Sequence, residues 1–300
     1  SERGSMGFGA YARSAGVERL VSREDYEERH GTGDFDGYWG IWDEPFLQFM
    51  GEELAAMPEP FFATLFTLSS HHPFVVPEQY AAMLPQGYTK IHPGVAYDDL
   101  AFRHFYERFQ NEEWFRRTIF VFVADHVSSE KFADRTRSYP GNMHILAFIH
   151  TPDGALRGEV GEITQQLDLM PTLLGLIGNR KPYFAFGRDV LNEPRRPRWS
   201  VSYDGEFRAL TDRGALLLND AGVPAGVRPV ELAPAGADTT AVTAPADTAD
   251  AENPSVPAAA DDPAADDPAA PTVDSLRRGF QALLQQYYQH IENKNYTVHD

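Results

Sequence analysis

Apolar residues in the first half of the chain fall into short continuous runs that alternate with amphipathic stretches. Runs of this kind, bounded by turn signals, are typical of strands covered on both faces; they span residues 61–68, 118–123 and 144–150. Apolar positions three and four residues apart are typical of helices; they occur in residues 46–57, 97–116 and 165–177. Alternating strands and helices predict an α/β fold in which a mostly parallel sheet is sandwiched by helices.

The pattern changes after residue 192. Short β-like pieces at residues 199–203, 206–211 and 215–218 are separated by Asp/Gly-rich turns, which predicts a small antiparallel element within 193–230. Residues 231–273 are rich in Ala, Pro and Asp, and such a segment cannot repay the entropy of ordering, so we expect a disordered acidic insertion. Apolar residues recur with helical period in 274–292, which predicts a closing helix packed on the main domain of residues 1–192.

The first 45 residues are rich in Gly and aromatic side chains and show little periodicity, so we expect an ordered loop there. The sequence begins Ser1-Glu2-Arg3 without an initiator Met, which we interpret as the boundary of a fragment. It shows no signal peptide and no apolar run of roughly 20 residues, the length needed to span a bilayer.

The net charge of the chain is −18, from 44 acidic and 26 basic residues. Ten of the acidic residues lie between 231 and 274, where there is no Lys or Arg, so the rest of the chain carries −8. This balance argues against nucleic acid as a partner, because a phosphate backbone attracts basic surfaces. The chain has no Cys, which excludes disulfides, thiolate metal sites and a Cys nucleophile.

Asp125 and His126 follow directly after the predicted strand at 118–123. Ligands bind beyond the carboxyl ends of strands in open α/β sheets, and a carboxylate beside an imidazole suits zinc or manganese. The alternative interpretation is a polar turn in which Asp125 caps backbone amides. His144, before the third predicted strand, is either a further ligand or a structural histidine.

His71 and His72 follow the predicted strand at 61–68 and precede Pro73. Either one is placed to contact an anionic substrate oxygen or to donate a proton, and the alternative is a surface pair without a role. The sequence contains no Gly-x-Ser-x-Gly elbow, no Walker loop and no His-Glu-x-x-His helix. Ser138-Tyr139-Pro140-Gly141 lacks the Arg of the sulfatase nucleophile signature and follows the metal pair, so we reject it as a nucleophile.

Taken together, these motifs resemble the lipoteichoic acid synthase family, a branch of the sulfatase and alkaline phosphatase superfamily. The matching stretches occur in the family's order and cover residues 4 to 192; they are residues 4–8, 39–46, 67–74, 123–126, 166–174 and 186–189. A further match to the family's closing helix lies at residues 285–294. Leu146 stands where many members have Pro, a minor departure.

The resemblance implies an alkaline phosphatase-like fold, of which this chain is the downstream, N-terminally truncated part. It implies that Asp125 and His126 bind one divalent metal, Mn or Zn, and that His71 contacts substrate. The family's membrane helices, first acidic metal ligand and nucleophilic Thr would precede Ser1, so we expect the chain alone to be inactive. The implied activity is that of a phosphoglycerol transferase or a phosphodiester or sulfate ester hydrolase. Its substrate would be a glycerophosphate lipid or another phosphate or sulfate ester outside the cytoplasm, with the enzyme held at the cell membrane.

A rival from a different class is a non-catalytic remnant that keeps the fold as a binding or scaffolding module. Loss of a nucleophile favours the remnant, whereas retention of His71, Asp125 and His126 together favours an enzyme.

Overall fold

A computed structural model describes residues 1–131, 136–137 and 139–193, and five short stretches beyond them: residues 199–203, 205, 207–211, 214–218 and 224–228. The chain divides into two compact units. The first comprises Ser1–Arg137 and His144–Arg157; the second comprises the described residues within Ser138–Met143 and from Gly158 onward. The predicted insertion at 231–273 and the predicted closing helix at 274–292 lie outside the described residues. The domain boundaries drawn from the sequence stay predictions.

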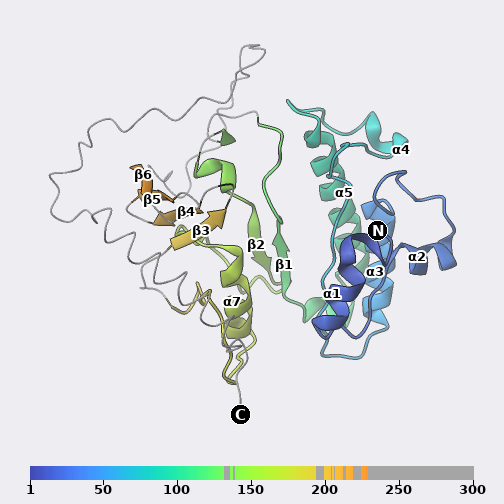
Figure 1. The fold of residues 1–300 in the computed structure, drawn as a ribbon. Helices are drawn as coiled ribbons and strands as arrows, with labels where there is room; N and C mark the ends of the chain where they lie inside the picture. The colour runs from blue at the N-terminus through green and yellow to red at the C-terminus, as the bar shows by residue number, and fades with distance from the viewer. Residues whose placement is uncertain are drawn as a thin grey trace. The chain divides into compact units, whose positions relative to one another are not determined.

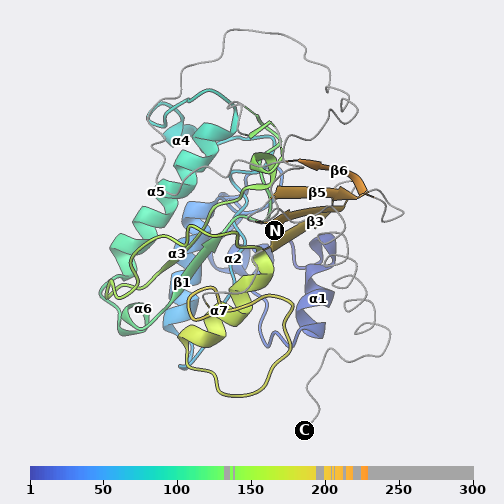
Figure 2. The ribbon, with the colours of Figure 1, turned by 90° about the vertical axis from the view of Figure 1, so that its left-hand side faces the viewer.

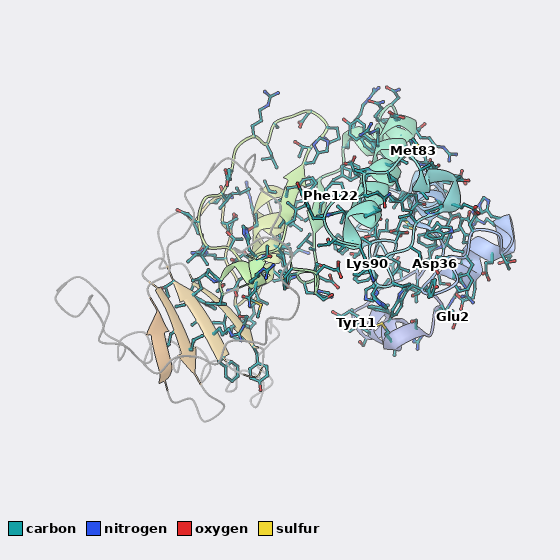
Figure 3. All side chains as sticks on the ribbon, turned by 90° about the horizontal axis from the view of Figure 1, so that it is seen from above. Glu2, Tyr11, Asp36, Met83, Lys90 and Phe122 are labelled. Atoms are coloured by element: carbon teal, nitrogen blue, oxygen red, sulfur yellow. The ribbon has the colours of Figure 1, made fainter. Side chains whose placement is uncertain are left out.

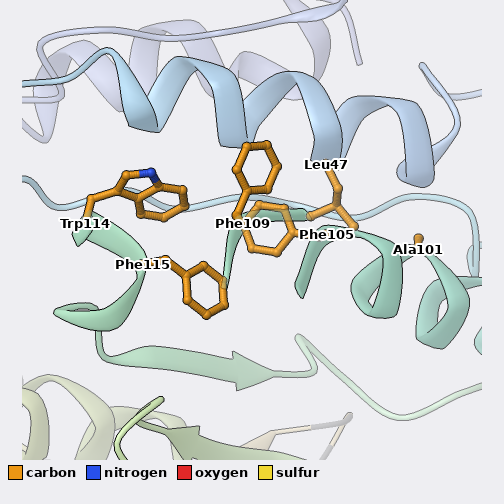
Figure 4. Close-up of a cluster of buried hydrophobic side chains, with 6 residues drawn as sticks. All are labelled: Leu47, Ala101, Phe105, Phe109, Trp114 and Phe115. Carbon is orange, nitrogen blue, oxygen red and sulfur yellow. The ribbon is translucent and has the colours of Figure 1, made fainter. Parts of the chain in front are cut away.

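Helices make up most of the first unit (Figure 1). In chain order these are η1 (Ser5–Gly7), α1 (Phe8–Ser14), α2 (Arg23–His30), α3 (Asp43–Ala55), α4 (Glu78–Ala81), α5 (Ile91–Phe109) and α6 (Glu113–Arg116). Helices α3 and α5 lie side by side and share the main apolar core. Its buried members are Leu47, Ala101, Phe105, Phe109, Trp114 and Phe115 (Figure 4). The helices predicted at 46–57 and 97–116 are therefore present, with α6 as a separate turn after α5.

The N-terminal 45 residues are not the loop that their composition suggests. Helix α2 begins at a capping box in which the backbone N–H of Ser22 donates to Asp25 Oδ2 at 2.8 Å. The guanidinium of Arg3 pairs with the same carboxylate at 2.7 Å, which ties the start of the chain to α2. The Ser-x-x-Asp spacing is a helix-start signal in the sequence, but α2 is so polar that it lacks the apolar period by which helices are usually found.

Two strands of the first unit pair as an antiparallel ladder, β1 (Phe120–Val123) with β2 (Ala147–His150). Phe120 lies opposite His150 and Val123 opposite Ala147. Phe122 of β1 faces α5, where its ring packs edge-on against Phe102 with centroids 5.1 Å apart (Figure 3). The parallel pairing expected for these two strands is wrong. Parallel strands need a long crossover, usually a helix, whereas the described chain between β1 and β2 has only the single-turn η3 (Gly141–Met143).

The apolar run at 61–68 forms no strand pairing within the described residues. Phe61 and Leu65 pack against the α3–α5 core, but Phe62 is 88% exposed and Phe66 is 51% exposed. The prediction of a strand covered on both faces was therefore wrong for this segment. A strand needs neighbours that exchange backbone hydrogen bonds with it, and continuous apolar sequence alone cannot supply them.

The second unit contains η4 (Gln166–Asp168), α7 (Leu169–Leu176) and a four-stranded meander. The strands are β3 (Trp199–Tyr203), β4 (Phe207–Thr211), β5 (Gly214–Leu218) and β6 (Pro224–Arg228), each antiparallel to the next (Figure 2). The small antiparallel element predicted after residue 192 is confirmed, with β6 as an additional strand. The described helices are all too short or too polar to cross a lipid bilayer.

Candidate active site

Asp125 and His126 form a turn that begins where the β1–β2 ladder ends. The N–H of Ala124 donates to Leu146 O at 3.0 Å and extends the pairing by one residue beyond β1. The N–H of His126 then donates to Asp125 Oδ1 at 2.9 Å. Both side chains are exposed, 55% for Asp125 and 69% for His126. The capping role that we considered as an alternative is thus present at Oδ1, and Oδ2 of the same carboxylate lies 3.5 Å from His126 Nε2.

The hydrogen bond of His126 fixes which ring nitrogen can bind a metal. Nδ1 lies 2.7 Å from the carbonyl oxygen of Val127, and a carbonyl only accepts, so Nδ1 must carry the proton. In the neutral ring, Nε2 therefore carries the lone pair, and it lies 3.5 Å from Asp125 Oδ2. A backbone carbonyl on the other nitrogen is the usual way in which a metal-binding histidine is oriented.

The spacing of these two donor atoms fits one metal ion. Zinc donors lie about 2.0–2.2 Å from the ion at tetrahedral angles, which separates neighbouring donors by roughly 3.4 Å. Asp125 Oδ2 and His126 Nε2 are 3.5 Å apart. In the part of the chain that the structure describes, no group of three or more His, Asp or Glu side chains is placed to hold a metal ion. The pair therefore offers two donor atoms, fewer than a metal site needs, and exposed His144 does not complete the set.

His71 sits in a tight loop that follows the 61–68 segment. Its N–H donates to Leu68 O at 3.0 Å, and its own carbonyl accepts from the N–H of Phe74 at 2.9 Å. Nδ1 donates to His72 O at 3.0 Å, so Nε2 again carries the lone pair of the neutral ring. The side chain is exposed, as a substrate contact requires.

Trp39 supports this loop from a distant part of the sequence. Its indole Nε1–H donates to His72 O at 2.6 Å, and its ring packs edge-on against His71 with centroids 4.4 Å apart. The contacts of His71 thus come from Trp39 and its own loop, whereas those of His126 come from its own turn. The two predicted site elements are built separately, and sequence reasoning gave no role to Trp39.

An open hollow of about 710 Å³ borders the His71 loop. Pro73 and Phe74 line it on the loop side, and Tyr88 and Lys90 line it before α5. Lys90 is labelled in Figure 3. Glu130 also borders it and accepts a hydrogen bond from the backbone N–H of Lys90 at 3.0 Å. The lining of the hollow thus combines apolar surface with one cation, Lys90, and one anion, Glu130, and begins two residues after His71.

In the second unit, the matching stretches at residues 166–174 and 186–189 are joined by a buried network of hydrogen bonds. Asp168, 2% exposed, accepts hydrogen bonds from the N–H of Gln165 at 3.0 Å and of Arg188 at 2.9 Å. Thr172 donates to Asp168 O at 2.7 Å and accepts from the N–H of Val190 at 3.1 Å. A Cβ at Gly187 would lie 1.9 Å from Leu167 O, so only glycine allows this approach. These residues join two segments and are too buried to bind substrate.

The geometry defines a class: an α/β protein with an exposed carboxylate–imidazole pair at a strand end and a second histidine in a braced loop. A family model described as Sulfatase matches residues 1–179, which is more than half of the chain, and the chain belongs to the sulfatase family. This confirms the predicted superfamily.

Similar proteins agree with this assignment. The chain is 26% identical over 215 residues to the lipoteichoic acid synthase-like protein YvgJ of Bacillus subtilis, covering 64% of this chain and 34% of that protein. It is 25% identical over 180 residues to lipoteichoic acid synthase 2 of the same organism, covering 53% of this chain and 27% of that protein. The chain thus spans about a third or less of the length of these relatives.

A solved structure shows the fold. A protein in the alkaline phosphatase superfamily from Vibrio parahaemolyticus matches with a TM-score of 0.58 and 26% identity, covering 73% of this chain and 55% of that one. The predicted α/β, alkaline phosphatase-like fold class is confirmed. The family model and this structure thus agree on the superfamily.

Proposed function

We propose that this chain is the downstream part of a metal-dependent enzyme that transfers or hydrolyses phosphoglycerol-type esters outside the cytoplasm. The observation that carries the proposal is the Asp125–His126 half-site, whose two donor atoms are 3.5 Å apart with the imidazole tautomer fixed by Val127. The family assignment and the similarity to lipoteichoic acid synthases support phosphate esters as the substrate class. A sulfate ester is the second candidate, because the family description names sulfatases.

In this proposal Asp125 and His126 hold Mn²⁺ or Zn²⁺, which would neutralise charge developing on the ester oxygens. His71 contacts an anionic substrate oxygen, because its ring is exposed and its Nδ1 is already committed to the His72 carbonyl. Protonation at Nε2 would give His71 a donor for that oxygen. The nucleophilic Thr, the further metal ligand and the membrane attachment stay predictions from the family resemblance.

Paramagnetic line broadening tests the half-site in the chain as it stands, because it detects weak Mn²⁺ binding. Substoichiometric Mn²⁺ should broaden the imidazole signals of His126 first. His104 is a matched internal control: its Nδ1 lies 3.1 Å from Glu44 Oε1, so it too is a carboxylate–imidazole pair, but one that bridges α3 and α5. The His104 signals should stay sharp at the Mn²⁺ level that erases those of His126.

Two variants complete the test. Asp125→Ala should abolish the selective broadening, whereas Asp153→Ala, which removes another exposed carboxylate of the same unit, should leave it intact. Glycerol 1-phosphate should then shift the ring signals of His71, and glycerol should not; a sulfate ester that shifts them as strongly would favour sulfatase chemistry. Equal broadening of His104 and His126, or no broadening of either, would refute the metal site and favour the non-catalytic scaffold.

A further inference from the structure

Asp43 connects the start of α3 to the loop that carries His71. Its carboxylate accepts hydrogen bonds from the N–H of Leu68, 3.0 Å from each oxygen, and from the N–H of Ser69 at 2.7 Å. In return the N–H of Asp43 donates to Ser69 Oγ at 3.1 Å. Asp43 is 4% exposed and Ser69 is 4% exposed. The buried carboxylate of Asp43 therefore anchors the loop at Ser69, which lies two residues before His71.

A second carboxyl group lies against the first. Asp98 on α5 is in hydrogen-bond contact with the side chains of both Asp43 and Ser70. Its Oδ1 is sealed from solvent and has no hydrogen-bond partner among the described residues. Helix α5 touches the loop directly, since a Cβ at Gly94 would lie 3.1 Å from Ser70 Cα and 3.3 Å from Ser69 O. The loop is thus held between two acidic side chains from different helices.

Two carboxyl groups in hydrogen-bond contact and away from water cannot both be ionised without strong repulsion. A hydrogen bond between them requires that one carries a proton. Asp43 already accepts from two backbone amides, which favours its charged form, as does its place in the first turn of α3. Asp98 has no comparable donors, so it is the group that holds the proton and donates to Asp43.

We propose that Asp43 and Asp98 share one proton and that this protonated pair positions the 68–72 loop, and with it the exposed Nε2 of His71. Both are positioning residues that do not touch substrate. The consequence for substrate binding rests on the proposed function, whereas the proton-sharing pair itself does not.

The charges around the pair set the direction of its titration. Burial, followed by the neighbouring charge of Asp43, raises the pKa of Asp98 to about 8, and burial also raises the pKa of Asp43. The other titratable groups near Asp43 are the α-amino group of Ser1, Glu44 and Tyr97. Glu44 is engaged by His104 at 3.1 Å and by Tyr80 OH at 3.3 Å. The pair therefore keeps its proton at neutral pH and loses it as the pH rises through about 8, when repulsion loosens the loop.

Trp39 supplies the reporter, because its indole N–H donates to His72 O and its ring contacts His71. In ¹H–¹⁵N spectra recorded from pH 6 to 10, the indole signal of Trp39 should move with a midpoint near pH 8. Asp98→Asn puts a permanent N–H donor in place of the titrating proton, so it should abolish this shift and hold the signal at its neutral-pH position. The indole signal of Trp114, which lies in the α3–α5 core, should not move.

Control variants separate the pair from its neighbours. His71→Gln removes any contribution of imidazole protonation and should keep the alkaline transition, as should Glu44→Gln. If Asp98→Asn fails to fold, titration of the carboxyl carbons of the wild-type chain decides the question, since one of the two should titrate near pH 8. A Trp39 transition that persists in Asp98→Asn, or both carboxyl carbons titrating below pH 6, would overturn the proposal. Neither result depends on metal or substrate, so the proposed function would stand or fall separately.

Discussion

Gly51 in the middle of α3 allows the Phe109 ring to pack against the helix backbone. A Cβ at Gly51 would lie 2.1 Å from Phe109 Cε2 and 2.3 Å from Cζ. Carbon atoms pack at about 3.5–4.0 Å, so Gly51→Ala requires the ring to retreat by roughly 1.4 Å. The ring has little room, because it is 5% exposed and its centroid lies 5.1 Å from that of Phe105 and 5.9 Å from that of Trp114.

Overpacking of this severity costs about 3 kcal/mol, the upper part of the usual range. Alanine regains about 1 kcal/mol through its higher helix propensity. Gly51→Ala should therefore lower the free energy of unfolding by about 2 kcal/mol, which corresponds to a melting shift of roughly 4–8 °C for a folded region of this size. Urea denaturation followed by far-ultraviolet circular dichroism measures the loss directly.

Two comparisons make the test specific. Gly33→Ala should be neutral, because nothing lies within 4 Å of its Cβ position. Phe109→Leu replaces the ring with a smaller side chain and should partly rescue Gly51→Ala. The double variant should therefore be about 1 kcal/mol more stable than the sum of the two single effects predicts. A Gly51→Ala chain as stable as the wild type would refute the packing described between α3 and the Phe109 ring.

Two further predictions concern buried charge. Glu53 is 3% exposed and is paired with both Arg19 and Arg29. In urea denaturation the double variant Arg19→Ala/Arg29→Ala should therefore lose about 3 kcal/mol of stability, more than the sum of the losses in the two single variants. Arg103→Ala is the control: its partner Asp99 is exposed, so stability should change by less than about 0.5 kcal/mol. Because the pKa of Asp98 is raised to about 8, the native state binds more protons than the unfolded state between about pH 4 and pH 8. Wild-type stability should therefore fall relative to Asp98→Asn by up to about 1.4 kcal/mol per pH unit across that window, and parallel stability curves would contradict the raised pKa.

The elements that sequence reasoning located correctly are those whose signal is local. Helix α5 carries an apolar stripe at helical spacing, and β3 to β5 follow one another within a few residues, so residues close in sequence determine them. The pairing of β1 with β2 depends on the path of the intervening chain, and the apolar runs contain no information on that path. The prediction of a strand at residues 61–68 failed for the same reason, because the apolar sequence of this segment does not reveal which neighbours it has.

The candidate site also has parts with local contacts, which the sequence indicated, and parts with long-range contacts, which it did not. The Asp125–His126 pair and the Nδ1 bond of His71 are made between adjacent residues, so the sequence could nominate these side chains as candidates. The residues that brace the loop were missed because they act across long distances in the chain. Trp39 reaches His72 over 33 residues and Asp43 reaches Ser69 over 26. An acidic residue at the start of a helix is ordinarily explained by the helix dipole, which gave no reason to look for a second carboxyl group on α5.

Exposure distinguishes the residues proposed for chemistry from those that hold them in place. His71, Asp125 and His126 are exposed, and each has a polar atom in a hydrogen bond with nearby backbone. The anchoring residues Asp43 and Asp168 are buried, with both carboxylate oxygens engaged by backbone amides. A buried carboxylate stabilises a loop only while its hydrogen-bond donors and its charge state are preserved. In the proposed arrangement, the position of His71 therefore depends on a proton that His71 itself does not bind, and pH can alter the proposed substrate contact without changing any residue that makes it.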